Sequence, residues 1–156
     1  MRWLVVVALL ACGCTTLKRP GAEALQGSVE HGGHRYKVFE MAGSWHQKRA
    51  HCKSLGGYLA VIESAGEQSF IAELAAGRYL SLGASDEERE DNWRWINGAA
   101  WEFTGWMDGQ PNNYGEDEHY LATYDDGLWV DVAAEGDSFW MPIGCICEWD
   151  EQGDIQ

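Results

Sequence analysis

The stretch SWHQKRAHCKSLGGYLAVIESAGEQSFI, residues 44–71, predicts a helix, a short apolar strand and a second helix. Ser44 has the side chain of a helix N-cap, and the helix that follows would bury Trp45 and Cys52, which are seven residues apart on one face. A Gly-Gly pair then marks a turn before the apolar run YLAVI. The stretch therefore places both regular helices in the first half of the chain.

The second helix of this stretch has the clearest boundaries. Ser64 and Glu67 have the spacing of a capping box, and Gly77 supplies a helix stop. Beyond this helix the chain is rich in turns and tryptophans, and strand patterns occur in YLSLGAS (79–85), HYLATYDDGLWVDV (119–132) and PIGCICEW (142–149). Helices followed by a long strand-rich region predict an α+β domain.

The composition narrows the classes of function. A chain of 156 residues has the length of one domain, and nine tryptophans with nineteen glycines favour a loop-rich fold over a helical bundle. The formal net charge of −14 would repel phosphate backbones, so nucleic acid is a poor partner. The same charge suits divalent cations, although solubility alone explains it as well. Because the sequence has neither a G-x-S-x-G nor an H-E-x-x-H motif, we do not expect an enzyme.

The N-terminus predicts export. Residues 1–11 hold one arginine followed by an apolar run that is too short to cross a bilayer and is typical of a signal peptide. The run ends in LLACGC, which resembles a bacterial lipobox, with Cys12 as the predicted lipidated residue and Cys14 as the alternative. An ordinary cleaved signal peptide is the other interpretation. The expected location is the outer membrane or cell surface, with membrane contact only through the lipid; a secreted or periplasmic protein is the alternative.

The remaining chain divides into three parts. Residues 12–32 are predicted to be the lipidated N-terminus and a flexible linker, because glycines and small polar residues occur there without an apolar periodicity. His31 and His34 are assigned to this linker rather than to a metal site. Residues 33–150 are predicted to be the folded domain, and residues 151–156 a tail.

The order of landmarks resembles the C-type lectin-like domain from about residue 33 to residue 150. The two-helix stretch is followed by LGASDEEREDNWRWINGAAWEFTGW, which is similar to the family's glycine-containing strand and its Trp-x-Trp strand. GQPNNYGEDEHY, GLWVD and CICEW complete the order. The resemblance implies a C-type lectin-like fold with two helices, mostly antiparallel strands and a long loop region.

The resemblance also implies a disulfide between Cys52 and Cys147. Cys145 then has no obvious partner, and because Cys145 and Cys147 face the same side of a strand, a swapped pairing with Cys52 stays open. The family's usual second bridge is missing, since Tyr120 and the segment VAAEG (132–136) hold no cysteine. The loop between these positions therefore lacks a covalent brace.

The polar loop GQPNNYGEDEHY, residues 109–120, resembles the family's calcium and sugar site. Calcium takes six to eight oxygen ligands from carboxylates, amide carbonyls and backbone. The resemblance implies four ligands that would also meet a carbohydrate: Gln110, Asn112, Glu118 and Asp131. It also implies a cis Pro111, and Glu116 and Asp117 are alternatives to Glu118 in a rearranged loop.

One departure from the family's pattern weakens this site. The family's Asn-Asp pair is Val130-Asp131 here, so one side-chain oxygen is lost, and the implied ligands carry only two negative charges. We therefore expect weak, calcium-dependent glycan binding. A calcium-independent module that binds a surface protein or mediates adhesion is the alternative. The tripeptide Gln-Pro-Asn matches neither the mannose-type nor the galactose-type motif, so it predicts no particular sugar, and the oligomeric state also stays open.

Most tryptophans are predicted to be core residues. Trp45, Trp95, Trp106 and Trp129 resemble framework positions of the family. Three aromatic residues are freer to line a binding face, although each is more easily explained by partial burial: Trp101, Tyr114 and Trp140.

Overall fold

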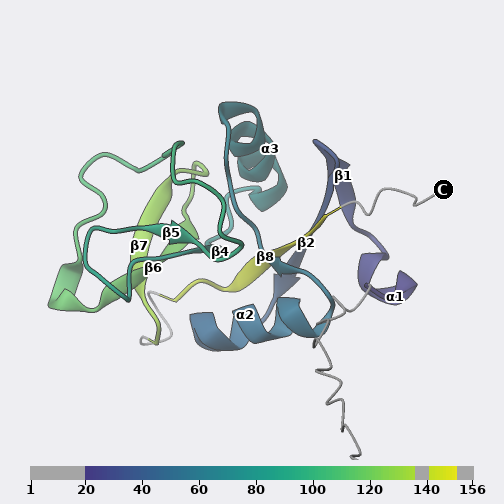
Figure 1. Cartoon of the computed structure of the whole chain (residues 1–156), viewed down its shortest axis with the longest axis horizontal. Helices are drawn as coiled ribbons and strands as arrows, with labels where there is room; N and C mark the ends of the chain where they lie inside the picture. The colour runs from purple at the N-terminus through teal and green to yellow at the C-terminus, as the bar shows by residue number, and fades with distance from the viewer. Residues whose placement is uncertain (1–19, 136–140, 151–156) are drawn as a thin grey trace, which may run out of the picture.

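The computed structural model of this protein describes residues 20–135 and 141–150. Eight strands in these ranges form one sheet with the order β1-β2-β8-β4-β6-β7, while β3 pairs with β8 and β5 with β4 (Figure 1). Their bounds are β1 Val29–His31, β2 His34–Glu40, β3 Tyr58–Leu59, β4 Leu80–Ser85, β5 Arg94–Trp95, β6 Glu118–Thr123, β7 Trp129–Ala133 and β8 Gly144–Asp150. All pairings are antiparallel except β4 with β8, so the predicted α+β fold is confirmed.

Both predicted helices are present, as α2 (Trp45–Ser54) and α3 (Ala65–Ala75), and they lie on opposite sides of the β2–β8 pair in Figure 1. Two shorter elements, α1 (Ala22–Leu25) and the 3₁₀ turn η1 (Tyr114–Glu116), were not predicted. No helix in the described ranges has the length and hydropathy that a membrane span requires.

The helix caps follow the sequence with one difference. Ser44 and Gln47 form a reciprocal capping box at the start of α2. At the start of α3 the Ser64 side chain accepts a hydrogen bond from the Glu67 backbone N–H, but the Glu67 carboxylate accepts the N–H of Glu63 instead of closing the box. Its other oxygen accepts the Tyr36 hydroxyl, so Glu67 ties the helix to β2.

The interior face of α2 also differs in one position. Trp45 and Cys52 are buried as predicted, but Lys48 is buried on this helix as well. The Lys48 amine donates to the backbone carbonyl of Pro142 at 2.6 Å. A buried lysine is tolerated at this position because its amine donates a hydrogen bond to that carbonyl.

The predicted linker is ordered in its second half, which corrects the sequence interpretation. β1 pairs with β2 in antiparallel register, and the His31 ring stacks on Phe70 of α3 at 4.2 Å. Short strands that gain their stability from pairing leave little periodicity in the sequence, so this strand was missed. The predicted signal peptide, the lipidation residues Cys12 and Cys14, and the tail 151–156 lie outside the described residues.

Tryptophans organise the core as predicted. Trp129 on β7 is fully buried, and its ring lies 5.5–5.8 Å from those of Trp95, Trp101 and Trp106. Trp45 belongs to a second cluster and donates its indole N–H to the Leu82 carbonyl of β4 at 2.8 Å. The two clusters join α2, β4 and β7 into one interior.

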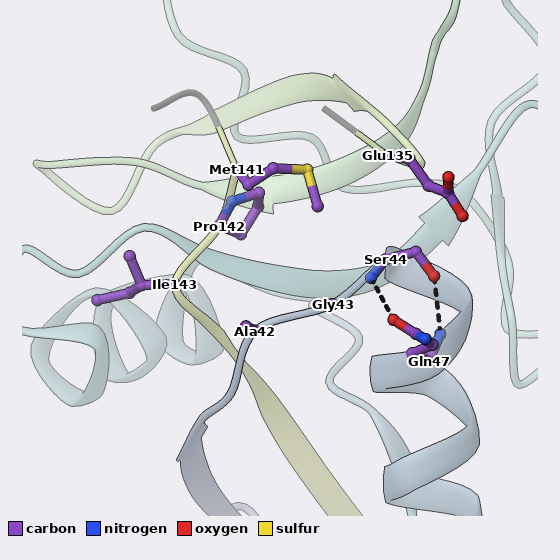
Figure 2. A pocket seen from close by; sticks show the side chains of 8 residues that line it. All are labelled: Ala42, Gly43, Ser44, Gln47, Glu135, Met141, Pro142 and Ile143. Atoms are coloured by element: carbon purple, nitrogen blue, oxygen red, sulfur yellow. Dashed lines mark hydrogen bonds between the residues drawn. The ribbon is translucent and has the colours of Figure 1, made fainter. Parts of the chain in front are cut away.

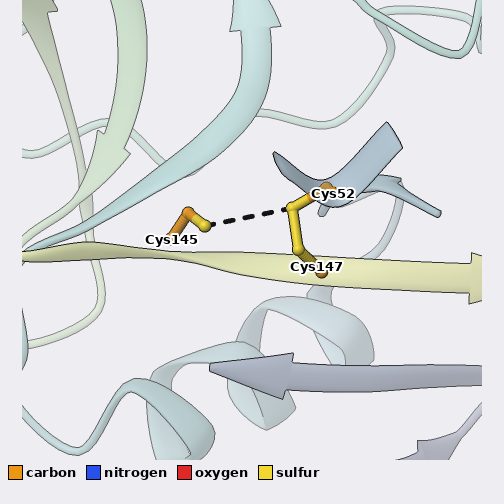
Figure 3. Close-up of side chains that lie close together, drawn as sticks. All are labelled: Cys52, Cys145 and Cys147. Carbon is orange, nitrogen blue, oxygen red and sulfur yellow. Dashed lines mark hydrogen bonds between the residues drawn. A yellow bond between two sulfur atoms is a disulfide. The ribbon is translucent and has the colours of Figure 1, made fainter. Parts of the chain in front are cut away.

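The implied disulfide is present between Cys52 of α2 and Cys147 of β8 (Figure 3). Cys145 is a buried free thiol two residues earlier on the same strand, and its Sγ lies 3.9 Å from the Sγ of Cys52. Strand alternation explains the closeness, because residues i and i+2 share a face. Cys52 therefore has a second sulfur within contact distance.

Tyr120 occupies the place where the family's second bridge is missing. Its hydroxyl donates to the Glu87 carboxylate at 2.6 Å and lies 3.0 Å from Nε2 of His46, and its ring packs 4.7 Å from Trp45. Hydrogen bonds and ring packing thus fix β6 against α2 without a covalent link.

A second feature of β8 is the buried carboxyl of Glu148, whose side chain is 1 % exposed. It accepts the Val61 N–H and the Tyr58 hydroxyl, and Nδ1 of His34 lies 2.8 Å from it. Burial raises the pKa of Glu148 to about 8, while the two hydrogen bonds act in the opposite direction. The nearby charges of Glu67 and Asp150 contribute to this rise.

The Glu148 carboxyl should make stability depend on pH. Because its pKa is higher in the folded than in the unfolded state, the folded state binds the proton more tightly, and stability falls as the pH rises from about 4.5 to about 8. We expect Glu148→Gln to reduce this fall by more than about 1.4 kcal/mol, the equivalent of one pKa unit. Urea unfolding of both proteins at the two ends of this range measures the difference. An equal fall in the two proteins would contradict the assignment.

Cys52 should accept Cys145 as a substitute partner. In a chain that carries Cys12→Ser and Cys14→Ser, we expect Cys147→Ser to form a Cys52–Cys145 disulfide, because the two sulfurs are already in contact. Thiol titration after unfolding without reductant should find no free thiol. The control Cys145→Ser keeps the native bridge and also has none, whereas two free thiols in Cys147→Ser would contradict the expectation.

Candidate functional site

The polar loop 109–120 is held between two parts of the sheet. It follows the isolated bridge between Trp106 and Trp129 and leads directly into β6. β6 and β7 are antiparallel neighbours, with Leu121 opposite Asp131, so the end of the loop and Asp131 lie close together. The Gln110–Pro111 peptide is cis, as the family resemblance implied.

Asp131 fixes the loop to the sheet. Its carboxylate is buried, with 3 % of the side chain exposed. Its oxygens accept the backbone N–H of Asn112 at 3.0–3.1 Å and the backbone N–H of Asn113 at 2.6 Å. Three contacts from one carboxylate bring both loop residues to the same point, and charge-assisted bonds of this type are stronger than neutral ones.

Glu118 closes the other side of the loop. Its carboxylate accepts the backbone N–H of Tyr114 at 2.9 Å, and its own backbone N–H donates to the side-chain oxygen of Asn113 at 3.1 Å. Asn113 has a φ of 44°, a left-handed conformation that asparagine tolerates better than most residues. Asn113 is the one structural residue of the loop that the sequence interpretation missed, and an asparagine close to a Gly was the signal for a tight turn.

The electrostatics of the loop are those of an acidic site without a counterion. Burial raises the pKa of the Glu118 carboxyl, opposed by the hydrogen bond from Tyr114, and the charges of Asp131 and Asp117 raise it further. No lysine or arginine of the described ranges forms a salt bridge with Glu118 or Asp131. A cation at this point would relieve the repulsion between the two carboxylates.

Of the four implied ligands, Gln110 is the one with an unpaired buried oxygen among the described residues. Its side-chain oxygen Oε1 is buried and has no hydrogen-bond partner among the described residues. A buried acceptor without a partner is costly, and such groups are usually paired. Asn112, two residues on, is exposed, so its amide can turn toward the same side of the loop.

Residues 42–148 match the sequence model of the family described as the lectin C-type domain. The chain belongs to the C-type lectin family. It is 33 % identical over 132 residues to lectin BRA-3 of Megabalanus rosa, covering 82 % of this chain and 78 % of that lectin. It is also 33 % identical over 91 residues to the hepatic lectin of Gallus gallus, covering 57 % of this chain and only 44 % of the relative's length.

The fold agrees with solved C-type lectin structures. The cow CD23 carbohydrate-recognition domain, crystallised with an oligosaccharide, superposes with a TM-score of 0.75 at 25 % identity over 81 % of this chain and 95 % of that domain. Both sequence relatives are animal lectins, so the bacterial lipoprotein inferred from residues 1–14 stays a prediction. The family model and the two relatives are lectins, which are carbohydrate-binding proteins without catalytic activity.

The four implied ligands fit calcium in kind. Gln110 has a buried acceptor without a partner, and Glu118 and Asp131 are carboxylates without a cationic partner. The oxygens of Asp131 are less available to a calcium ion, because both already accept hydrogen bonds from backbone N–H groups. Glu116 and Asp117, the alternatives to Glu118, are both exposed on the outside of the η1 turn.

Val130 is oriented away from this site. Its side chain is 7 % exposed and packs in the cluster of Trp45, Tyr120 and Val132, while its neighbour Asp131 faces the loop. Alternation along β7 therefore explains why this position offers no ligand. Restoring an asparagine here would bury an amide among apolar side chains.

Of the three aromatic residues that the sequence left free to line a binding face, one lies beside the polar loop. Tyr114 is 80 % exposed beside Glu118. Trp101 is half-buried in the tryptophan cluster, 4.6 Å from the Trp95 ring, and Trp140 lies outside the described residues. Tyr114 is thus the aromatic side chain that can meet a ligand at this loop.

A separate pocket of about 600 Å³ lies at the N-terminus of α2 (Figure 2). It is lined by Ala42, Gly43, Ser44, Gln47, Glu135, Met141, Pro142 and Ile143. None of the implied ligands is among these lining residues, and Figure 2 shows the Ser44–Gln47 capping box at its wall. The pocket is therefore a different feature from the polar loop.

The Asp131 carboxylate should stabilise the fold even without a metal ion. We expect Asp131→Asn to lower the free energy of unfolding by about 1–3 kcal/mol in the presence of chelator, because an amide cannot accept both backbone N–H groups as well as a carboxylate does. Urea denaturation of both proteins measures the difference in the free energy of unfolding. The matched control is Asp126→Asn, whose carboxylate accepts one backbone N–H in an exposed turn; a loss no larger than the control's would contradict this role.

Proposed function

We propose that this C-type lectin binds carbohydrate weakly through one calcium ion held at the loop 109–120. The observation that carries the proposal is the buried Gln110 oxygen without a partner. It belongs to a loop that is held by two carboxylates without a counterion, Glu118 at the end of the loop and Asp131 on β7. Gln110, Asn112, Glu118 and Asp131 are the proposed ligands. The carbohydrate binding of the family supports the proposal.

The residues would orient a sugar whose hydroxyls replace water on the bound calcium ion. When bound, calcium would offer coordination positions to two neighbouring sugar hydroxyls in place of water. Gln110 and Asn112 would present amide groups to the same hydroxyls, and Glu118 would accept a hydrogen bond from one of them. No covalent bond forms or breaks. Tyr114, which is exposed next to Glu118, would place its ring against an apolar face of the sugar.

Weak affinity follows from the ligand set. Glu118 and Asp131 supply two negative charges, Val130 supplies no ligand, and the Asp131 oxygens are shared with backbone N–H groups. Fewer charged ligands lower calcium affinity, and extracellular calcium modules reach dissociation constants of about 10⁻⁴–10⁻³ M. We place this site in that range.

A second function has an observation in its favour. The loop is already held by Asp131 and Glu118 through backbone N–H groups, so it keeps its shape without an ion. This favours a calcium-independent module that binds a surface protein or mediates adhesion. In both cases we propose that the protein is exported and meets the membrane only through a lipid on Cys12.

Calcium should raise the melting temperature. At a concentration tenfold above the dissociation constant, a ligand that binds only the folded state stabilises it by about 1.4 kcal/mol, which corresponds to a rise of about 3–6 °C. We expect this rise in the native chain with millimolar calcium, and its loss with excess chelator, in a scanning calorimeter. Glycan-array binding should require calcium in the same range.

Two substitutions that leave the Asp131 contacts intact serve as tests. Glu118→Gln and Gln110→Ala should abolish the rise, whereas Glu116→Gln, an exposed carboxylate of the same loop, should keep it. An unchanged melting temperature at calcium well above the millimolar range would exclude the calcium proposal. Retention of a protein partner in chelator would then support the second function.

A further inference from the structure

Three cysteine sulfurs lie together in the protein interior, between α2 and β8. Cys52 belongs to α2, and Cys145 and Cys147 belong to β8. The three Sγ atoms all lie within 4.8 Å of one another, and each of the three residues is fully buried. Figure 3 shows the sulfurs of Cys145 and Cys147 on the same side of β8, both directed toward Cys52. This part of the interior therefore holds one sulfur more than a single disulfide requires.

The spacing of the sulfurs suits a metal ion with three ligands. The Sγ atoms of Cys52 and Cys145 are 3.9 Å apart. A trigonal ion with metal–sulfur bonds of about 2.3 Å separates its ligands by about 4.0 Å, so this pair already has the spacing of one edge of such a site. Cys52 and Cys147 are joined by the disulfide. After reduction, rotation about the Cα–Cβ bonds would let these two sulfurs move apart to the same distance.

The surroundings of the sulfurs are apolar, with one buried cation nearby. Leu59 and Trp149 pack in the same cluster. The amine of buried Lys48 donates to the carbonyl of Pro142, shortly before Cys145 on the chain. Burial raises the pKa of the Cys145 thiol and the charge of Lys48 lowers it, so the amine lies close enough to offset negative charge on this sulfur.

We infer that the reduced form of this chain binds one soft monovalent cation, Cu(I), through the thiolates of Cys52, Cys145 and Cys147. Soft thiolate ligands select Cu(I). Zinc takes four ligands in structural sites, whereas this group of the described residues offers three. The site shares no residue with the calcium site proposed above and goes beyond the proposed function.

Reduction must come before copper binding. A phosphine gives two electrons to the bond between Cys52 and Cys147 and takes up the oxygen of one water molecule, whose two protons go to the two sulfurs. Each of the three thiols then releases its proton to solvent when its sulfur bonds to Cu(I). Copper and the disulfide therefore compete for the same two sulfurs, and the oxidised chain should not bind copper.

Copper titration of the reduced full chain tests this inference. All variants carry Cys12→Ser and Cys14→Ser, so that only the cysteines of the folded domain remain. Under anaerobic conditions with a phosphine reductant, the chain competes with bathocuproine disulfonate for Cu(I), and we expect it to remove one ion per chain from the coloured complex. Cys145→Ser should weaken binding about tenfold or more, because two thiolates are left. The same chain with its disulfide intact should remove none.

Two controls separate this site from other sulfur atoms and from binding to an unfolded chain. Met41→Leu removes a thioether that packs against the same cluster, and it should leave copper affinity unchanged. Cu(I) should raise the melting temperature of the reduced chain, since a ligand that binds the folded state stabilises it. If the reduced chain is unfolded, Cu(I) should instead restore the tryptophan fluorescence of the native protein. The inference is overturned if Cu(I) does neither, or if Cys145→Ser binds copper as tightly as Met41→Leu.

Discussion

The shape of the loop 109–120 depends on the hydrogen bonds that the carboxylate of Asp131 accepts. This carboxylate is buried at the centre of β7 and accepts the backbone N–H groups of Asn112 and Asn113. Through these bonds a polar loop of twelve residues gains a fixed shape, although it has few apolar side chains to bury. Glu118 and the Asn113 side chain complete the loop from the β6 side. Without this carboxylate the amides of Gln110 and Asn112 would have no common geometry.

The price of this arrangement is uncompensated negative charge. Burial raises the pKa of the Glu118 carboxyl, and the charges of Asp131 and Asp117 raise it further. The Gln110 oxygen adds a further acceptor that is buried without a donor. A divalent cation would both balance the two carboxylate charges and coordinate the Gln110 oxygen. A protein partner would have to supply hydrogen-bond donors to the same groups.

Much of the fold could be predicted from local sequence signals. Ser44, Trp45 and Ser64 mark helix ends and a buried face by their own chemistry, and the strands of the second half follow apolar alternation. What could not be predicted depends on contacts between distant segments. β1 forms by pairing with β2, and buried Lys48 donates a hydrogen bond to the Pro142 carbonyl, 94 residues away in the sequence.

The candidate site was also predicted only in part from the sequence. The residue types of Gln110, Asn112, Glu118 and Asp131 were visible in the sequence through the family resemblance. The sequence could not show that backbone N–H groups bond both Asp131 oxygens or that Val130 faces the core. Both follow from the register of β7 in the sheet.

The most direct test of calcium-dependent binding at this loop is a crystal structure of the protein grown with millimolar calcium. The account predicts an ion at about 2.3–2.6 Å from oxygens of Gln110, Asn112, Glu118 and Asp131, with open positions facing solvent. Density for water alone against the Gln110 oxygen, with the loop unchanged, would contradict it.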